Sequence, residues 1–329
     1  MKRLAIIAAL IAVFAGGFYW RARSQRKPPE EAFAGERRVT LWSSTAQVRE
    51  PLAALSYGER VDVLLRQGED AEVRTPQGLI GWVDARQLLS AELWHRVTNI
   101  IAQARVMPVQ ASGHTKVLSN LRIEPGRDTQ RIVQLGRGSS VEVLAREGLD
   151  APPTSNASNE ESQQSDEPKR EDWLLVRAKT EEMGELAGWV LGRFIEFDLP
   201  SPLPDYTSAA AMHVVAWFVL NQVPDKDGSP RPQYLVVGTR GSEGQACDFT
   251  LMRVYTWGLA RQRYETAFVQ SDLCGKLPVR VNPAAQLAGD ASFQFAELGD
   301  KGATNAEYRM HQTVVRRVRQ AEAGQKARR

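Results

Sequence analysis

The chain has 329 residues, a formal net charge of +3, and 43% hydrophobic and 25% charged residues. This length allows two or three domains, and this composition is that of globular protein with sizeable cores. The small net charge gives no reason to expect a nucleic-acid partner, because such proteins usually carry a strongly basic surface. Eight Trp and seventeen Pro residues, with few long helical patterns, favour a mainly β fold.

The first segment, residues 1–23, has the composition of a membrane helix. Two basic residues precede seventeen residues without a charge, LAIIAALIAVFAGGFYW, which is the lower limit of length for a bilayer span. The aromatic trio that ends this run is followed by arginines, as is typical of a membrane interface. We therefore expect an uncleaved single-pass anchor. A signal peptide cut after Ala15 is the alternative.

The orientation of this anchor is left open by its flanks. Basic residues lie on both sides of the apolar run, and those at 21–27 outnumber Lys2 and Arg3. The positive-inside rule, taken literally, places the bulk of the chain in the cytoplasm. Residues 24–38 are polar and contain Pro-Pro, so we expect a stalk there.

An internal repeat is the sharpest feature of the sequence. Residues 58–68 (GERVDVLLRQG) and 138–148 (GSSVEVLAREG) share Gly-x-x-Val-x-Val-Leu-x-Arg-x-Gly at an offset of 80 residues. Further on, GWVDARQL at 81–88 and GWVLGRFI at 188–195 share Gly-Trp-Val-x-x-Arg at an offset of 107. The repeat predicts two copies of one small domain.

The second copy therefore contains extra residues. The segment 151–172 is rich in Ser, Glu, Asp and Pro and poor in aliphatic residues, so it cannot bury a core. We expect a disordered insert there. The two copies then span residues 39–90 and 109–198, and alternating apolar residues within each predict short strands.

The second copy resembles the bacterial SH3 (SH3b) domain family. The resemblance is carried by LSNLRIEPGRDTQRIVQLGRGSSVEVL (118–144), by Trp-x-x-Val at 173–176 and by Gly-Trp-Val at 188–190. The first copy departs from this pattern, since Thr-Leu-Trp at 40–42 replaces Asn-Leu-Arg and Thr45 replaces Pro125. Membership of the first copy therefore depends on the repeat. The resemblance implies small SH3-like barrels that lie outside the cytoplasm and bind cell-wall material or other peptides.

Candidate ligand-groove residues follow from the same two copies. Aromatic side chains in so small a barrel are more often core than groove. If a loop of one copy binds a ligand, the second copy is favoured, because the first has no counterpart of its Arg and Pro. The candidates are Arg122, Pro125, Trp173, Trp189, Trp42, Tyr57 and Trp82.

The remainder of the chain predicts a helical linker and a further β domain. Apolar residues at helical spacing predict a linker helix at 91–108, and the proline-rich segment 199–206 predicts a domain boundary. Residues 207–318 predict an antiparallel β domain, followed by a basic tail at 319–329. The strand-like runs of this domain are 212–223, 233–240, 249–257, 263–270, 291–298 and 307–318.

The sequence contains no recognisable catalytic, cofactor or metal motif. The four His residues are far apart along the chain, and no phosphate loop, dinucleotide fingerprint or nucleophile motif is present. We therefore expect no cofactor and no metal site. Cys247 and Cys274 are separated by 27 residues and form either one disulfide or two separate buried thiols.

Two functions remain open at this point. The first is a membrane-anchored, non-enzymatic binding or scaffold protein of the cell envelope, whose tandem modules bind peptide or peptidoglycan. In this hypothesis the bulk of the chain is extracytoplasmic. The second is an envelope hydrolase with its catalytic site in residues 207–318 and the SH3-like modules as targeting domains. A His–carboxylate or Cys–His pair converging in a cleft would favour the second.

Overall fold

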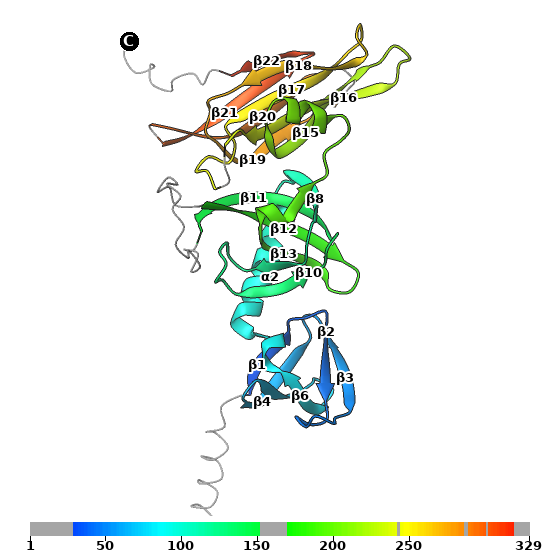
Figure 1. The fold of residues 1–329 in the computed structure, drawn as a ribbon, viewed down its shortest axis with the longest axis vertical. Coiled ribbons are helices and arrows are strands. Elements are labelled where there is room, and N and C mark those ends of the chain that lie inside the picture. Colours follow the sequence, from blue (N-terminus) through cyan, green and yellow to red (C-terminus); the bar gives the residue numbers. More distant parts are fainter. Residues whose placement is uncertain (1–28, 152–169, 242–243, 286–288, 301, 319–329) are drawn as a thin grey trace, which may run out of the picture. The chain divides into compact units, whose positions relative to one another are not determined.

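In a computed structural model of the chain, we describe residues 29–151, 170–241, 244–285, 289–300 and 302–318. Within these residues the fold is mainly β and consists of four antiparallel sheets (Figure 1). The chain forms two compact units, with the boundary between Trp94 and His95.

Module 1 (residues 30–90) is a seven-stranded sheet in the order β3-β2-β6-β5-β4-β1-β7. Its inward faces carry aliphatic residues such as Val39, Leu41 and Val61, each at most 1% exposed. A short 3₁₀ helix, η1 (Ala85–Gln87), precedes the last strand. The strands are β1 (Glu30–Ala34), β2 (Arg38–Trp42), β3 (Pro51–Ser56), β4 (Arg60–Gln67), β5 (Asp70–Arg74), β6 (Ile80–Asp84) and β7 (Leu88–Ser90).

The stalk predicted at 24–38 is wrong over part of its length. Strand β1 occupies Glu30–Ala34 and pairs with both β4 and β7. Ala32 and Ala34 are fully buried, and Ala34 exchanges backbone hydrogen bonds with Glu59 and Gly58. Small side chains at alternate positions let this strand enter the core, although its mean composition is polar.

Module 2 (residues 111–197) repeats the same strand order, β10-β9-β13-β12-β11-β8-β14. Its 3₁₀ helix, η2 (Gly192–Phe194), again precedes the last strand. The strands are β8 (Ala111–Thr115), β9 (Ser119–Arg122), β10 (Arg131–Leu135), β11 (Ser140–Asp150), β12 (Arg170–Thr180), β13 (Gly184–Leu191) and β14 (Ile195–Phe197).

The predicted disordered insert at 151–172 is too long at its C-terminal end. Residues 170–172 belong to β12 and pair with Asp150, Leu149 and Gly148 of β11. The acidic side chains of Glu171 and Asp172 resemble those of the insert, but their carboxylates are held by arginines of this module. Residues 152–169 lie outside the described residues.

The Gly-Trp-Val glycine has the same role in both modules. A Cβ atom on Gly81 would lie 2.7 Å from the carbonyl oxygen of Trp42 and 2.8 Å from the Leu41 side chain. A Cβ atom on Gly188 would lie 2.8 Å from the Arg122 carbonyl oxygen. Only glycine permits this close approach of neighbouring strands.

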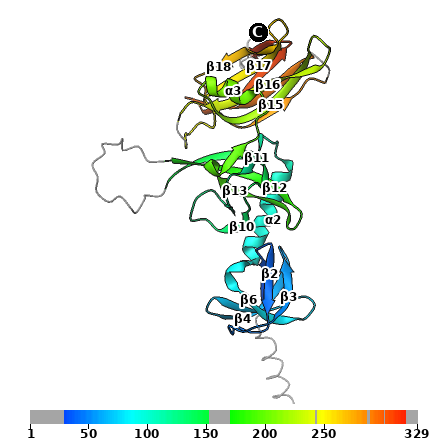
Figure 2. The ribbon, with the colours of Figure 1, turned by 45° about the vertical axis from the view of Figure 1, so that its right-hand side comes forward.

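Helix α2 (Ala91–Val106) lies within the predicted linker range. From His95 onward it belongs to the same compact unit as module 2, and it runs beside that module's sheet (Figure 1, Figure 2). Ile100, Ile101 and Ala104 pack against Leu144 and the strands beside it. Residues 203–209 form α3 (Leu203–Ala209), so the linker predicted at 199–206 ends in a helix rather than in an extended chain.

The C-terminal region contains two four-stranded sheets with one core between them. Leu235 and Val254 of the first sheet pack with Phe293, Phe295 and Tyr308 of the second. The other side of the first sheet packs against α3 through Leu203. The first sheet contains β15 (His213–Pro224), β16 (Pro230–Thr239), β17 (Leu251–Gly258) and β18 (Arg263–Gln270). The second contains β19 (Gly275–Asn282), β20 (Ala291–Gly299), β21 (Gly302–His311) and β22 (Val314–Arg317).

Two strands of this region differ from the sequence prediction. Strand β19 was not predicted because Pro278 interrupts its apolar pattern. The proline is accommodated where the β19–β20 register shifts, between Lys276 and Arg280. The run predicted as one strand at 307–318 is divided between β21 and β22 by a turn in which Gln312 has φ +54°.

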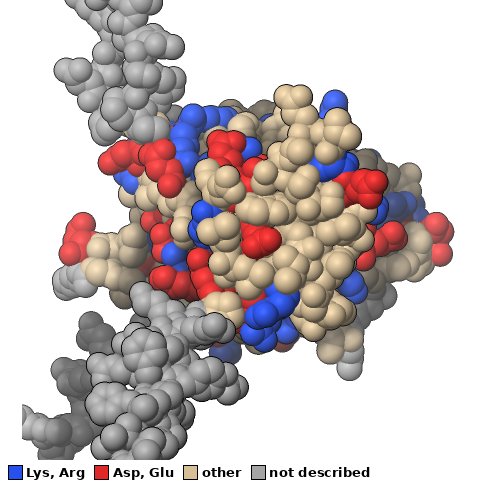
Figure 3. Space-filling model, turned by 90° about the horizontal axis from the view of Figure 1, so that it is seen from below, with Lys and Arg blue, Asp and Glu red and all other residues tan. Residues whose placement is uncertain are grey.

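Several predictions fall on residues that the structure does not describe. The anchor at 1–23, the first part of the stalk and the basic tail at 319–329 lie outside the described residues. Across the described ranges, no helix has the length and apolar character needed to cross a bilayer. Acidic and basic side chains are interspersed around an uncharged area on the face drawn in Figure 3.

Candidate binding pocket between module 2 and the C-terminal sheets

A buried arginine of module 2 is bonded to the C-terminal region. Arg146 lies on β11, and its side chain is 3% exposed. Its Nη2 donates to Asp172 Oδ1 at 2.5 Å within the module. Its Nη1 donates to Asp248 Oδ1 at 3.2 Å and to the carbonyl oxygen of Cys247 at 3.1 Å. Two carboxylates and a carbonyl therefore compensate the cost of burying this guanidinium.

Asp248 is itself held from three sides. Its Oδ1 also accepts a hydrogen bond from Lys276 Nζ at 2.8 Å, and its Oδ2 accepts one from the Leu277 amide at 2.8 Å. The disulfide between Cys247 and Cys274 brings the segment before β17 next to the start of β19. The carboxylate is thus fixed in position to receive Arg146.

A buried glutamine makes a second connection between the same two parts. Gln110 is fully buried, and its side-chain oxygen accepts a hydrogen bond from the Val279 amide at 2.7 Å. Its side-chain nitrogen donates to the Val279 carbonyl oxygen at 3.3 Å. The Gln110 carbonyl accepts a bond from the Trp217 amide at 3.1 Å. Module 2 and the C-terminal sheets are therefore joined by specific polar contacts.

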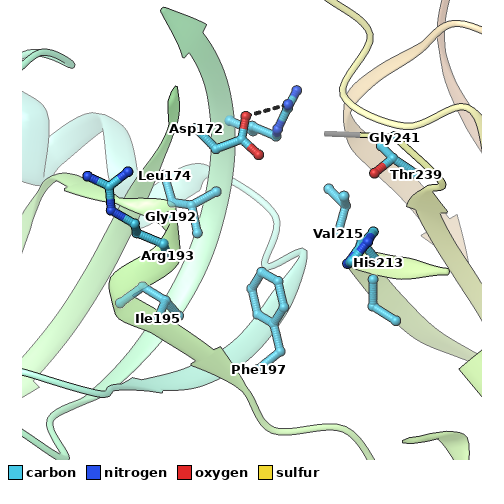
Figure 4. Close-up of a pocket in the computed structure, with 12 residues that line it drawn as sticks. Asp172, Leu174, Gly192, Arg193, Ile195, Phe197, His213, Val215, Thr239 and Gly241 are labelled. Atoms are coloured by element: carbon cyan, nitrogen blue, oxygen red, sulfur yellow. Dashed lines mark hydrogen bonds and ion pairs between the residues drawn. The ribbon is translucent and has the colours of Figure 1, made fainter. Parts of the chain in front are cut away.

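Beside these contacts lies a pocket of about 460 Å³ (Figure 4). Module 2 supplies one wall, including Leu174, Ile195 and Phe197, and strands β15 and β16 supply the other, including Val215 and Thr239. Leu174 and Ile195, which are 4% and 6% exposed, form an apolar part of the lining with Phe197 and Val215. This volume suits a small ligand or a few residues of a peptide.

Arg193 and His213 line the pocket on opposite walls, and the ion pair of Arg146 with Asp172 also lines it. Arg193 comes from η2 of module 2, and His213 from the start of β15 (Figure 4). The Arg193 side chain is 39% exposed and donates through Nη2 to Glu171 Oε1 at 3.0 Å. This bond uses one face of the guanidinium and leaves further N–H groups directed elsewhere.

The carboxylate that orients Arg193 is shared with a second arginine. Glu171 is 4% exposed and also accepts hydrogen bonds from Arg127. The bond from Arg127, supplemented by Arg193, holds the pKa of Glu171 below its ordinary value of 4.5. Glu171 therefore stays ionised and fixes Arg193 at the pocket. An apolar pocket with a positioned guanidinium and an imidazole suits a ligand with an apolar body and an acidic group.

The groove residues predicted in module 1 are all half-buried and lie in two separate places. Trp42 and Trp82 lie directly opposite each other on β2 and β6, and Arg49 stacks over the Trp42 ring at 4.5 Å. Tyr57 packs edge-on against Trp94 with ring centres 5.5 Å apart. Burial raises the pKa of Tyr57, whose side chain is half-buried in this contact.

In module 2 the predicted residues are likewise divided. Arg122 and Trp189 lie directly opposite each other on β9 and β13, at the positions that Trp42 and Trp82 hold in module 1. Arg122 donates to the Thr129 carbonyl and so closes the loop that contains Pro125. Trp173 is 3% exposed and belongs to the core.

None of the seven predicted residues lines the pocket of Figure 4, so the sequence reasoning missed this site. One signal was present, because Arg193 is the arginine of Gly-Trp-Val-x-x-Arg and Arg146 is that of Val-Leu-x-Arg-x-Gly. Both arginines are accounted for by the repeat pattern, so neither stands out in the sequence as a site residue. Nothing local in the sequence indicates His213.

A His–carboxylate pair does occur in the C-terminal region, away from this pocket. His311 Nδ1 lies 2.5 Å from Asp290 Oδ1, and the two side chains are 72% and 76% exposed. They line a hollow of about 720 Å³ together with Ser292. The described residues contain no group of three or more His, Cys, Asp or Glu side chains arranged to hold a metal ion.

No family model and no curated protein matches the sequence. Among solved structures, an NlpC/P60 family protein from Bacillus cereus ATCC 10987 is 16% identical with a TM-score of 0.22, and the match covers 58% of this chain and 65% of that one. The chain thus spans less than two thirds of that protein. NlpC2 and NlpC1 from Trichomonas vaginalis are each 9% identical, with TM-scores of 0.17 and 0.18. Those matches cover 84% and 85% of this chain and 91% and 88% of the two proteins. TM-scores of this size do not establish a shared fold.

Proposed function

We propose that this chain is a non-enzymatic binding protein of the cell envelope that holds an acidic peptide or cell-wall fragment in the pocket of Figure 4. The observation that carries the proposal is the apolar pocket with Arg193, oriented by Glu171, in its wall. The guanidinium pairs with a carboxylate of the ligand, and the aliphatic walls take its apolar part. Specificity then depends on where the acidic group lies relative to the apolar groups.

The two modules act in this proposal as SH3-like domains. Their common strand order and the glycine that closes each sheet support one shared architecture. The resemblance of residues 118–144 to the bacterial SH3 family supports the assignment of module 2, and the repeat extends it to module 1. The C-terminal sheets serve as a third domain that completes the pocket.

In this proposal the chain is anchored in the membrane, and most of its residues lie outside the cytoplasm. The apolar segment 4–20 provides a single-pass anchor. The disulfide between Cys247 and Cys274 supports an oxidising compartment, because structural disulfides are rare in the cytosol. This favours an extracytoplasmic C-terminal region over the orientation that the flanking charges give.

Retention of the full-length protein on purified cell wall and on short acidic peptides tests the proposal. Arg193→Ala removes the guanidinium of the pocket, and we expect it to weaken retention by roughly tenfold or more. Arg86→Ala is the matched control, because Arg86 is the arginine of the first Gly-Trp-Val-x-x-Arg copy and does not line the pocket. Absence of retention for the wild type, or equal losses for both variants, would reject the proposal.

A second candidate function, an envelope hydrolase, is favoured by the proximity of His311, Asp290 and Ser292 in one hollow. A His–carboxylate pair can serve as a general base for a nearby hydroxyl. Release of soluble fragments from peptidoglycan is the readout, with His311→Ala as the variant and His95→Ala as the control. If the wild type and His95→Ala release fragments and His311→Ala does not, the hydrolase function replaces the first proposal.

A further inference from the structure

The outer face of the module 2 sheet is covered by helix α2. Leu144, Leu175 and Ala187 of the sheet form one cluster with Ala104 of the helix, and they are 0%, 7% and 1% exposed. Ile100, Ile101, Met107 and Trp189 pack against this cluster. An amphipathic helix thus supplies the apolar partner that this face requires.

The same sheet positions in module 1 are exposed. Strand pairing aligns Leu64 with Leu144, Leu65 with Ala145, Ile80 with Ala187, and Trp82 with Trp189. The first three are 39%, 51% and 47% exposed. We call this set (Leu64, Leu65, Ile80 and Trp82) the module 1 face. Aliphatic residues exposed together on one sheet face are a candidate interaction surface.

At the edge of each face, an arginine pairs with a carboxylate at the equivalent position of the neighbouring strand. In module 2, Arg177 pairs with Glu142 at 2.5 Å and donates to the carbonyl oxygens of Ala104 and Arg105, at 3.0 and 3.3 Å. These carbonyls lie in the last turn of α2, where the regular backbone bonds end, and the Ala104 carbonyl also accepts one from the Met107 amide at 3.3 Å. Arg177 therefore caps the C-terminal end of the covering helix.

Module 1 has the corresponding pair without a helix. Arg74 occupies the position of Arg177, and its Nη2 donates to Asp62 Oδ2 at 3.0 Å. The Arg74 side chain is 43% exposed, so N–H groups remain accessible at the edge of the module 1 face. The same cap is therefore available to a helix that lies across this face.

One position changes the charge between the two faces. Leu175 in module 2 corresponds to Glu72 in module 1, since each lies opposite the tryptophan of its Gly-Trp-Val motif. A carboxylate among aliphatic side chains favours a basic residue on the bound helix. The two faces therefore use equivalent strand positions, carry larger side chains in module 1 at Leu65 and Ile80, and differ in charge at Glu72.

From these equivalences we propose that the module 1 face binds an amphipathic helix of a partner protein. The helix presents aliphatic residues at spacing i, i+1 and i+4, as Ile100, Ile101 and Ala104 do in α2. It carries a Lys or Arg opposite Glu72, and its C-terminal end lies at Arg74. This mode of binding is helix-in-groove recognition on a sheet face.

A labelled peptide copying residues 95–109 of this chain is the probe, with the full-length protein in lipid nanodiscs and fluorescence anisotropy as the readout. In this chain the copied segment packs against Leu175, whose equivalent in module 1 is Glu72. Glu72→Leu should therefore tighten binding of the probe by roughly tenfold. Leu65→Glu should weaken binding by more than tenfold. Arg74→Ala should weaken it by about threefold, as expected for loss of one helix cap.

Val48→Glu is the control, because Val48 is 94% exposed and lies outside the module 1 face. This variant should bind the probe as the wild type does. Failure of Glu72→Leu to bind the probe, or equal binding by Leu65→Glu and wild type, would overturn the proposal. Self-association of the protein without peptide, measured by sedimentation and abolished by Leu65→Glu, would also overturn it by assigning the face to a second copy of the chain.

Discussion

Arg146 and Asp248 are 102 residues apart in the sequence, yet Arg146 Nη1 donates to Asp248 Oδ1 at 3.2 Å with side chains only 3% and 2% exposed. The ion pair joins module 2 to the C-terminal sheets next to the candidate pocket. In module 1 the corresponding residue, Arg66, is 44% exposed and pairs with Glu30 at 2.6 Å. One repeated arginine thus makes a buried contact in one module and a surface contact in the other.

Arg146→Ala should lower the free energy of unfolding by about 1.5–3 kcal/mol, because it removes charged hydrogen bonds from the buried Asp248, which keeps Lys276, and from the partly exposed Asp172. The measurement is denaturant unfolding of the full-length protein. Arg66→Ala is the matched control and should cost less than about 1 kcal/mol, as exposed ion pairs do. Equal costs for the two variants would show that burial of Arg146 does not determine its contribution.

The glycine of each Gly-Trp-Val motif should not tolerate a side chain. Gly81→Ala and Gly188→Ala place a Cβ atom 2.7 to 2.8 Å from neighbouring backbone or side-chain atoms, so each should destabilise its module by about 1–3 kcal/mol. Thermal unfolding followed by circular dichroism provides the comparison. Gly299→Ala, where a Cβ atom meets nothing within 4 Å, should leave the midpoint nearly unchanged.

Removing the disulfide should destabilise the C-terminal region. The double substitution Cys247→Ser with Cys274→Ser opens a loop closed over 27 residues, for which chain entropy gives a loss of about 3–4 kcal/mol. Unfolding of the wild type with and without a reductant should differ by a similar amount. If the reductant lowers the stability of the wild type and of the double variant by the same amount, the loss does not come from this disulfide.

The proposed compartment has a separate test in cells. Alkylation of denatured protein taken from an acid-quenched lysate should label no thiol, since both cysteines are joined in the disulfide. Labelling of two thiols per chain would instead place the C-terminal region in a reducing compartment and contradict the proposed orientation.

Glu171 should make stability depend on acid pH. Hydrogen bonds from Arg127 and Arg193 lower the folded-state pKa of Glu171 below 4.5. Its contribution is therefore fully present above the unfolded pKa and is lost as the pH falls through the lowered folded value. Glu171→Gln should remove this part of the acid dependence, as measured by unfolding midpoints between pH 6 and about pH 2. If Glu171→Gln leaves the fall of the unfolding midpoint at acid pH unchanged, Glu171 does not contribute to that fall.

Strand periodicity and the repeat reveal much of the local structure. Val61 and Val63 alternate with polar residues as Val141 and Val143 do, and both pairs lie on the buried side of their strands. Helix α2 is equally visible in its spacing of apolar residues. These features are local, because backbone propensity and alternation operate over a few residues.

The candidate pocket could not be predicted from these local sequence patterns. Arg193 and His213 lie on opposite walls because module 2 and β15 pack together, and no short-range pattern encodes that packing. Likewise β1 enters the core through two alanines, whose weak hydrophobic signal is hidden by neighbouring glutamates. The sequence alone therefore determined the repeated module and its strand pattern, since these depend on side-chain alternation and turns. The tertiary structure decided which of two equivalent arginines is buried, which of two equivalent faces is covered, and where a ligand fits, because each depends on contacts between residues far apart in the chain.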